Sequence, residues 1–314
     1  MVMLSVVGLA MLHSPALIAD RLGTRSLHHA IAGVTQSWLK MLSDWRYWSF
    51  LALLAVLERA HPARRGEGLF SVGAAQDLVW LVAGPVFLNT FVHAYYLMLD
   101  GAYRPLLDGV SIDLQPVLGT AGVAAFAFVV GDFLNWLSHI IRHKVSALWH
   151  FHEVHHSQTS MSPLLDQRVH FVEHAVTATI FFLPATLLSL PSQTISVLAT
   201  ATILYTGFFH ANIRTNLGPL RYVLVTPQSH RVHHSSRPEH SDTNFGTIFC
   251  LWDRLFGLQY HDDNEYPPVG VTNERFPLER SARPLALLTT CARQLLHPFA
   301  SLLRDLRGGS ARRD

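Results

Sequence analysis

The sequence predicts an all-α protein, a polytopic bundle of membrane helices with a histidine-rich site for two metal ions on its cytoplasmic side. The composition supports the membrane part, because 49% of the residues are hydrophobic, only 15% are charged, and the mean hydropathy is +0.23. Several apolar runs have the length of a membrane span. The twenty histidines support the metal site, because thirteen of them fall between His139 and His240.

Other classes of protein find little support in the composition. The formal net charge is +2 and the basic residues are spread along the chain, so we expect no nucleic-acid partner. The two cysteines, Cys250 and Cys291, are too few for an iron–sulfur cluster or a disulfide framework. Metal chemistry, if present, must therefore depend on histidine.

Residues 1–76 are predicted to form an N-terminal lead-in with one short apolar segment. The first twenty residues are apolar but lack a basic start and a small-residue cleavage site, so they do not predict a signal peptide. An apolar run from Trp45 to Leu57 follows, with Arg59 just after it. This run is long enough to embed in a membrane and short for crossing one.

Residues 77–265 are predicted to form the membrane-embedded unit that carries the histidines. Asp77–Leu99 and Leu114–Leu137 each contain roughly the 20 apolar residues that a bilayer core requires. The loop between them, Asp100–Asp113, carries three aspartates, whereas arginine and lysine flank the spans on their other ends. By the positive-inside rule the acidic loop faces outward, so the second span ends at the cytoplasmic boundary.

A second pair of spans is expected between Ala175 and Ala211, an apolar stretch interrupted by Leu190-Pro191-Ser192-Gln193. Such a hairpin returns the chain to the side that it left, which places His210 near the earlier histidines. The remaining tail, residues 266–314, mixes leucine with arginine and is predicted to form an amphipathic helix.

Three histidine boxes have helical spacing. His139 and His143 stand four residues apart, and two HxxHH triplets follow, the first at residues 152–156 and the second at residues 230–234. On a helix, residues three and four apart project from one face, which is chelating geometry. The residues of the two triplets are His152, His155, His156, His230, His233 and His234.

Imidazole donors indicate a transition metal, because magnesium and calcium prefer oxygen. A single zinc uses about four protein ligands. Since the boxes contain eight histidines, they indicate two metal ions rather than one. His210 is predicted to be a ninth ligand, because it ends an apolar span where an unpartnered imidazole would be costly to bury.

Asp132 is predicted to support the site indirectly. It precedes His139 by two helical turns, from where its carboxylate could accept a hydrogen bond from a ligand imidazole and fix its tautomer. A structural ion pair is the competing interpretation. Weaker candidates for ligand or supporting roles are His150, His170, His174, Glu153 and Glu173.

The order of these boxes resembles the sterol desaturase and fatty acid hydroxylase superfamily of membrane enzymes. The segment GDFLNWLSHIIRHKVSALWHFHEVHHS, residues 131–157, is similar to the first two boxes of that superfamily. FFHANIRTNLGPLRYVLVTPQSHRVHHS, residues 208–235, is similar to the third. The motifs DTNFG at residues 242–246 and LWDRLFG at residues 251–257 resemble the segment that ordinarily follows.

This resemblance implies a helical membrane enzyme with a cytoplasm-facing di-iron centre that uses O2 to hydroxylate or desaturate a lipid. It implies iron ligation by the eight box histidines and His210, with Asn212 and Asn244 among the residues that surround the ligands. It implies no catalytic residue beyond the metal centre. Zinc can replace iron at imidazole sites in aerobic preparations.

The sequence departs from parts of the superfamily in two places. Ceramide-type hydroxylases carry a further histidine four residues after the His210 position, where this chain has Arg214, so a ceramide-like substrate is not implied. His61-Pro62 is followed by Ala-Arg rather than by paired glycines, so no cytochrome b5-like domain is visible. We therefore expect the electrons to come from a separate protein.

Two other classes of protein remain open on the sequence. A membrane zinc hydrolase and a metal-binding or transport protein would also gather histidines. The second box, HEVHH at residues 152–156, matches the HExxH pattern of a metalloprotease, which keeps the hydrolase open. A transporter would place ionisable groups near the middle of several spans, whereas these boxes lie just beyond span ends.

Overall fold

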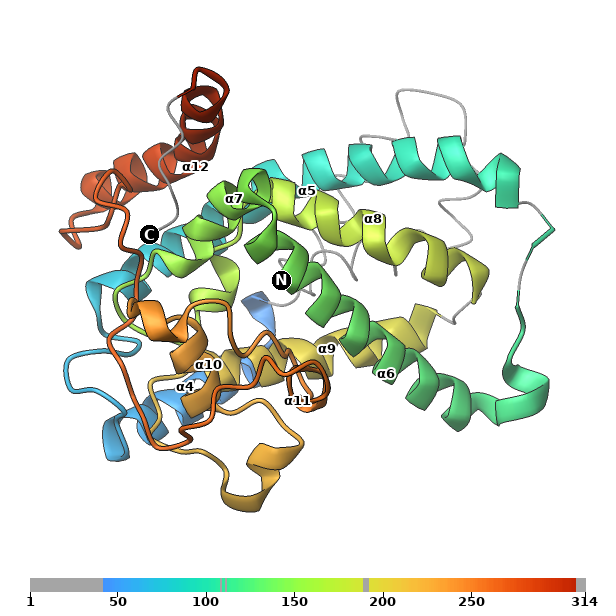
Figure 1. Cartoon of the computed structure of the whole chain (residues 1–314), viewed down its shortest axis with the longest axis horizontal. Coiled ribbons are helices and arrows are strands. Elements are labelled where there is room, and N and C mark those ends of the chain that lie inside the picture. The colour runs from blue at the N-terminus through green and yellow to red at the C-terminus, as the bar shows by residue number, and fades with distance from the viewer. Residues whose placement is uncertain (1–41, 108, 111, 189–191, 309–314) are drawn as a thin grey trace.

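The computed structural model describes residues 42–107, 109–110, 112–188 and 192–308, so the expectations for the first forty-one residues lie outside the described part. All regular structure within these ranges is helical, and β pairing is limited to isolated bridges such as Pro62 with Ile213. Figure 1 shows the long helices extending together from an end at which the shorter elements gather. The helices are α4 (Trp45–Ala60), α5 (Val72–Leu107), α6 (Gln115–Lys144), α7 (Ser146–His156), α8 (Phe171–Leu187), α9 (Ser192–His210), α10 (Pro227–His233), α11 (Leu251–Leu255) and α12 (Pro284–Leu306), with short 3₁₀ turns η1 (Leu165–Gln167), η2 (Gly218–Tyr222) and η3 (Pro238–His240).

Helix α5 is longer than the sequence predicts. The expected acidic loop at Asp100–Asp113 is helical up to Leu107, so only its second half connects two helices. Packing against α8 explains the extension, because the Tyr103 ring contacts Phe182 at 5.9 Å and Leu107 joins the cluster around that phenylalanine. Buried apolar area from this contact outweighs the turn-forming tendency of the intervening glycine and proline.

Helix α6 continues from the predicted span into the first histidine box. Among the described residues it is the one helix long and apolar enough to cross a membrane, and only 17% of its apolar window is buried. Two shorter apolar helical stretches occur at Val72–Ala83 and Phe171–Leu187. A kink lies at Gly119, whose φ of 63° is tolerated because glycine has no Cβ. The helix ends in Arg142-His143-Lys144.

Helices α8 and α9 occupy the stretch for which a hairpin is expected. α8 ends at Leu187 and α9 begins at Ser192, with residues 189–191 outside the described part. His210 is the last residue of α9. The hairpin therefore brings the chain back toward α7 and α10, which carry the two HxxHH boxes (Figure 1).

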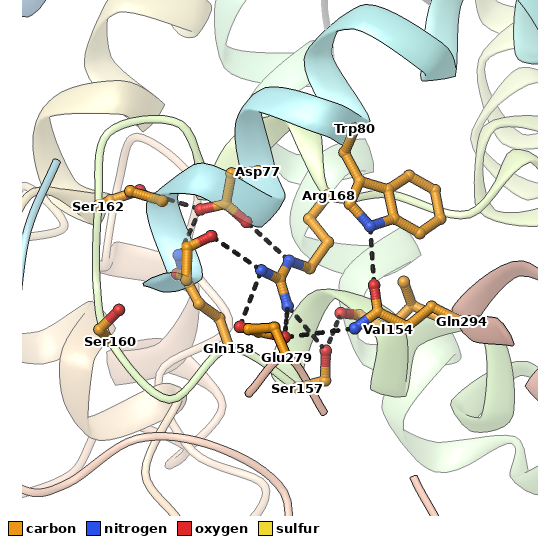
Figure 2. A network of polar contacts seen from close by, with 12 residues as sticks. Asp77, Trp80, Val154, Ser157, Gln158, Ser160, Ser162, Arg168, Glu279 and Gln294 are labelled. Atoms are coloured by element: carbon orange, nitrogen blue, oxygen red, sulfur yellow. Dashed lines mark hydrogen bonds and ion pairs between the residues drawn. The ribbon is translucent and has the colours of Figure 1, made fainter. Parts of the chain in front are cut away.

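A buried polar network ties these helices to the C-terminal region (Figure 2). The guanidinium of Arg168 donates to Asp77 on α5 at 2.7 Å and, through two nitrogens, to both carboxylate oxygens of Glu279 at 3.0 Å. It also donates to the Gly73 carbonyl and to the hydroxyl of Ser157, the residue after the second box. All three charged side chains are almost fully buried. The network therefore anchors the end of α7 to three distant segments.

We expect Arg168→Lys to lower the free energy of unfolding by about 1–3 kcal/mol, because an ammonium cannot reproduce the planar fork that serves two carboxylates and a carbonyl. The measurement is unfolding of the purified protein in detergent, followed by tryptophan fluorescence. Arg275→Lys is the matched control, since that side chain is exposed. Equal stability of the two variants would show that the network contributes little.

Helix α12 covers α7 from the outside. Its buried residues recur every three or four positions and include Leu287, Cys291 and Gln294. The Gln294 amide accepts a hydrogen bond from the Trp80 indole at 2.9 Å and donates to the Pro277 carbonyl. His150 on α7 lies 2.8 Å from the Asp305 carboxylate near the end of α12. The tail thus packs directly behind the second histidine box.

Candidate metal centre

The structure brings all nine predicted ligand histidines together in two adjacent groups. The first group draws on α6, α7 and α10, and the second on α7, α9 and the end of α10. Within each group the candidate ligand nitrogens lie within 4.8 Å of one another, and every ring is buried. The first group consists of His139, His143, His152, His156 and His233, and the second of His155, His210, His230 and His234.

Each HxxHH box is divided between the two groups, a feature that the sequence does not predict. On α7, His152 and His156 face the first group while His155 faces the second. On α10 the division is reversed, with one histidine in the first group and two in the second. The groups meet where the rings of His156 and His234 stack, with centroids 4.3 Å apart. Helices α7 and α10 therefore lie between two centres and serve both.

Distances between ring nitrogens fit a shared cation. Nε2 of His143 lies 3.1 Å from Nε2 of His156, and Nε2 of His230 lies 2.8 Å from His210 and 3.1 Å from His234. Two imidazole nitrogens bound to one metal at about 2.1 Å each are separated by roughly 3 Å. A neutral imidazole offers one donor and one acceptor, so His230 Nε2 cannot pair well with both neighbours. A metal satisfies all three nitrogens at once.

Backbone carbonyls around the site fix the tautomers of three rings. The Nδ1 atoms of His139, His233 and His210 each lie 2.8–2.9 Å from a backbone carbonyl, those of Phe245, Thr243 and Thr206. A carbonyl only accepts, so Nδ1 carries the proton and Nε2 keeps its lone pair. Nε2 of His139, His152 and His233 is buried without a protein partner among the described residues. These unsatisfied nitrogens are the ones that a bound metal would use.

Glu173 contacts the site most directly among the carboxylates. Its Oε2 lies 2.5 Å from Nδ1 of His152 and accepts from Arg142 at 3.1 Å, while Oε1 accepts from the His170 backbone. The last contact is half of a capping box that starts α8. Capping boxes ordinarily begin with Ser, Thr, Asp or Asn, so the sequence held no clear signal for this role of Glu173.

Burial favours the neutral form of the grouped imidazoles on α7 and α10. Burial, followed by the neighbouring histidines, lowers the pKa of His152, His156 and His234 well below its ordinary value. Burial lowers the pKa of His233 to about 4. Because metals bind the neutral ring, these residues are ready to ligate without releasing protons.

Asp132 differs from its expected role. Its carboxylate accepts from the backbone of Ile248 and Phe249 and from the Trp252 indole, at 2.8–3.2 Å. The ring that it was expected to hold, His139, bonds the Phe245 carbonyl instead. The reason is that the segment after the third box folds between Asp132 and the metal centre. Asp132 thus supports the site by holding this segment.

The two predicted asparagines bond neighbouring chain segments rather than the grouped rings. Asn212 accepts from Arg231 at 2.7 Å and donates to the Arg64 carbonyl. Asn244, with a positive φ of 57°, donates to the Ser229 carbonyl just before His230. Both hold segments that carry candidate ligands.

The weaker histidine candidates lie outside both groups. His150 pairs with Asp305, and His170 lies 3.1 Å from the Leu295 carbonyl. His174 is buried but is not among the grouped nitrogens. Glu153 accepts from Asn273 on the C-terminal segment, and its other oxygen lies 3.6 Å from His297, which belongs to neither group.

Comparison with known proteins matches the region that contains both groups. Residues 124–258 match the model of the family described as fatty acid hydroxylase. The ornithine lipid hydroxylase OlsE of Rhizobium tropici is 30% identical over 263 residues, which cover 77% of each chain. The alkylglycerol monooxygenase of Homo sapiens is 33% identical over 149 residues, 47% of this chain and 32% of the relative. Methylsterol monooxygenase 1 of Rattus norvegicus is 26% identical over 137 residues, 42% of this chain and 45% of the relative.

The extent of these matches differs between relatives. The chain spans about a third of the length of the alkylglycerol monooxygenases that it matches, whereas it spans 77% of the ornithine lipid hydroxylase. No solved structure matches the chain.

Proposed function

The chain belongs to the fatty acid hydroxylase family, and from this membership and the two histidine groups we propose that it is a membrane-bound di-iron oxygenase acting on a lipid. The observation that carries the proposal is the pairing of five and four buried histidines in adjacent groups. One metal would leave one group unexplained, and a zinc hydrolase needs only one such site.

The proposed ligands are the nine grouped histidines, which would hold two iron ions. When bound, such a pair supplies the activation of O2 and the oxidation of an unactivated C–H bond. The chain keeps the imidazoles neutral by burial and orients them through Nδ1 acceptors such as the Thr243 carbonyl. Phe245 is fully buried and contacts the rings of His139 and His143 at 5.6 and 5.0 Å. This phenylalanine excludes water from the first group.

We propose hydroxylation rather than desaturation, with a lipid alkyl chain as the substrate. The relatives named above are called hydroxylases or monooxygenases, and two are named for ornithine lipid and alkylglycerol. One oxygen atom of O2 enters the C–H bond and the other leaves as water. This balance needs two electrons and two protons, which a separate electron-donor protein would supply.

We propose that the protein is a multi-pass membrane protein with its metal centre on the cytoplasmic side. The apolar window of α6, of which little is buried, supports one span, and the apolar helices at Val72–Ala83 and Phe171–Leu187 support further membrane-embedded segments. The basic end of α6, with Arg142 and Lys144, favours the cytoplasmic side for the end that carries the histidines.

The test is metal analysis combined with lipid mass spectrometry. Protein expressed in iron-supplemented medium and purified without O2 should contain about two irons per chain, as expected for two groups of imidazole ligands. With a chemical reductant, it should consume O2 and add one oxygen atom to an alkylglycerol or an ornithine lipid. One tightly bound zinc without O2 consumption would support the hydrolase instead. A protein with two irons whose lipid product has lost two hydrogens would show that the reaction is desaturation.

A further inference from the structure

Residues 220–223 and 251–256, which we call the interfacial patch, expose apolar side chains on one continuous surface. Leu255 is 72% exposed, and Leu220, Tyr222 and Phe256 are each more than half exposed. The two segments are joined by a hydrogen bond from the Cys250 backbone to the Val223 carbonyl and by one from Arg254 to the Arg221 carbonyl. Exposed apolar surface of this kind marks a contact with another phase or partner.

The patch lies beside the apolar helix α6. The ring of Trp252 contacts Phe133 at 5.1 Å, and Phe256 stacks on Trp136 at 4.9 Å. About 25 Å of helix runs from the kink at Gly119 to Trp136, which is close to the roughly 30 Å of a bilayer hydrocarbon core. Trp136 and the patch therefore share the depth at which the apolar core ends, where tryptophan and tyrosine concentrate.

Two arginines converge on the same surface. The guanidinium groups of Arg221 and Arg254 lie over the Tyr222 ring, 4.6 and 5.1 Å from its centroid. Asp263 pairs with Arg221, so the three charged groups sum to one net positive charge. Together with Gln228 and Tyr260, they line an open pocket of about 480 Å³. Its chemistry suits an anion that carries several acceptor oxygens.

We propose that the interfacial patch lies in the headgroup layer of the membrane and that Arg221 and Arg254 bind the phosphate of an anionic phospholipid there. The inference rests on the membrane placement proposed above. The apolar residues reach the acyl boundary, while the arginines lie at the level of the phosphates. Ser229 also lines the pocket and directly precedes His230, so the bound lipid lies next to the second histidine group.

Spin labels test the depth of the patch in lipid nanodiscs. Three variants each carry one new cysteine for the label, at Leu255 in the patch, at Val117 on α6, or at the exposed Glu274. The native Cys250 and Cys291 are buried, so the label reacts with the new cysteine. We expect the labels at Leu255 and Val117 to collide more with O2 than with a water-soluble nickel chelate, and the label at Glu274 to show the reverse. If the label at Leu255 is exposed to water while the label at Val117 is in lipid, the proposal for the patch is wrong but the membrane placement stands. Water exposure at both positions would overturn the membrane placement as well.

Native mass spectrometry tests the headgroup site in detergent-purified full-length protein. Retention of phosphatidylglycerol by Arg221→Gln/Arg254→Gln should be at least about 10-fold weaker than by the wild type. The exposed pair Arg275→Gln/Arg280→Gln should retain the lipid normally. Equal losses in both double variants, or equal retention of phosphatidylcholine by the wild type, would contradict the proposal. Displacement of the lipid by millimolar inorganic phosphate would identify a free-anion site instead.

Discussion

His155→Ala is expected to abolish turnover while the protein still inserts into the membrane. His155 belongs to the group of four, and its removal leaves three imidazoles for that metal. Loss of a residue that merely supports a ligand typically costs 10–100-fold in metal affinity or activity, so loss of a ligand should cost at least about 100-fold. Because the group of five is untouched, the metal content should fall from about two ions per chain to about one.

The matched control is His150→Ala on the same helix. His150 lies outside both groups and pairs with Asp305, so this variant removes an imidazole from α7 without touching a grouped nitrogen. It should keep both metals and most of the activity. For both variants, the metal content is measured by metal analysis and the product is quantified by lipid mass spectrometry. Turnover retained by His155→Ala, or equal metal loss in the two variants, would remove His155 from the ligand set.

The histidine groups were predictable because their geometry is mostly local. Spacings of three and four residues define a helix face regardless of the rest of the fold, and an apolar hairpin is enough to return His210 to that region. The division of each HxxHH box between two groups was not predictable. It depends on how the histidine rings of α7 and α10 meet across the site, and these helices are more than seventy residues apart in the chain.

The supporting residues were harder to predict, because their partners are distant in sequence. Asp132 lies two turns from His139, yet its carboxylate holds the segment around Phe249, 117 residues away. Arg168 meets Asp77 and Glu279 across 91 and 111 residues. Periodicity cannot report such pairs, because each residue taken alone looks like an ordinary charged residue between apolar segments.

The orientation of the second box depends on Glu173, whose removal gives the second large expected effect. Glu173→Ala deletes the acceptor of His152 Nδ1 and the carboxylate that pairs with the fully buried Arg142. Removal of one partner of a buried ion pair lowers the free energy of unfolding by about 3–5 kcal/mol, because the other charge stays buried without a counter-charge. Loss of the acceptor frees the His152 ring to rotate, so metal affinity of the first group should fall about 10–100-fold.

Two comparisons separate the effect on the metal from the effect on folding. Glu173→Gln keeps an acceptor oxygen for His152 but loses the negative charge, so it should retain more metal than Glu173→Ala while remaining less stable than the wild type. Glu153→Gln changes another buried carboxyl group that contacts Asn273 and no grouped histidine, so it should keep both metals. The measurements are unfolding in detergent and metal content after exposure to a chelator. If Glu173→Ala loses stability but keeps both ions in the chelator, Glu173 supports the fold alone, and the ring of His152 must be held by the packing of α7 against α6 and α8.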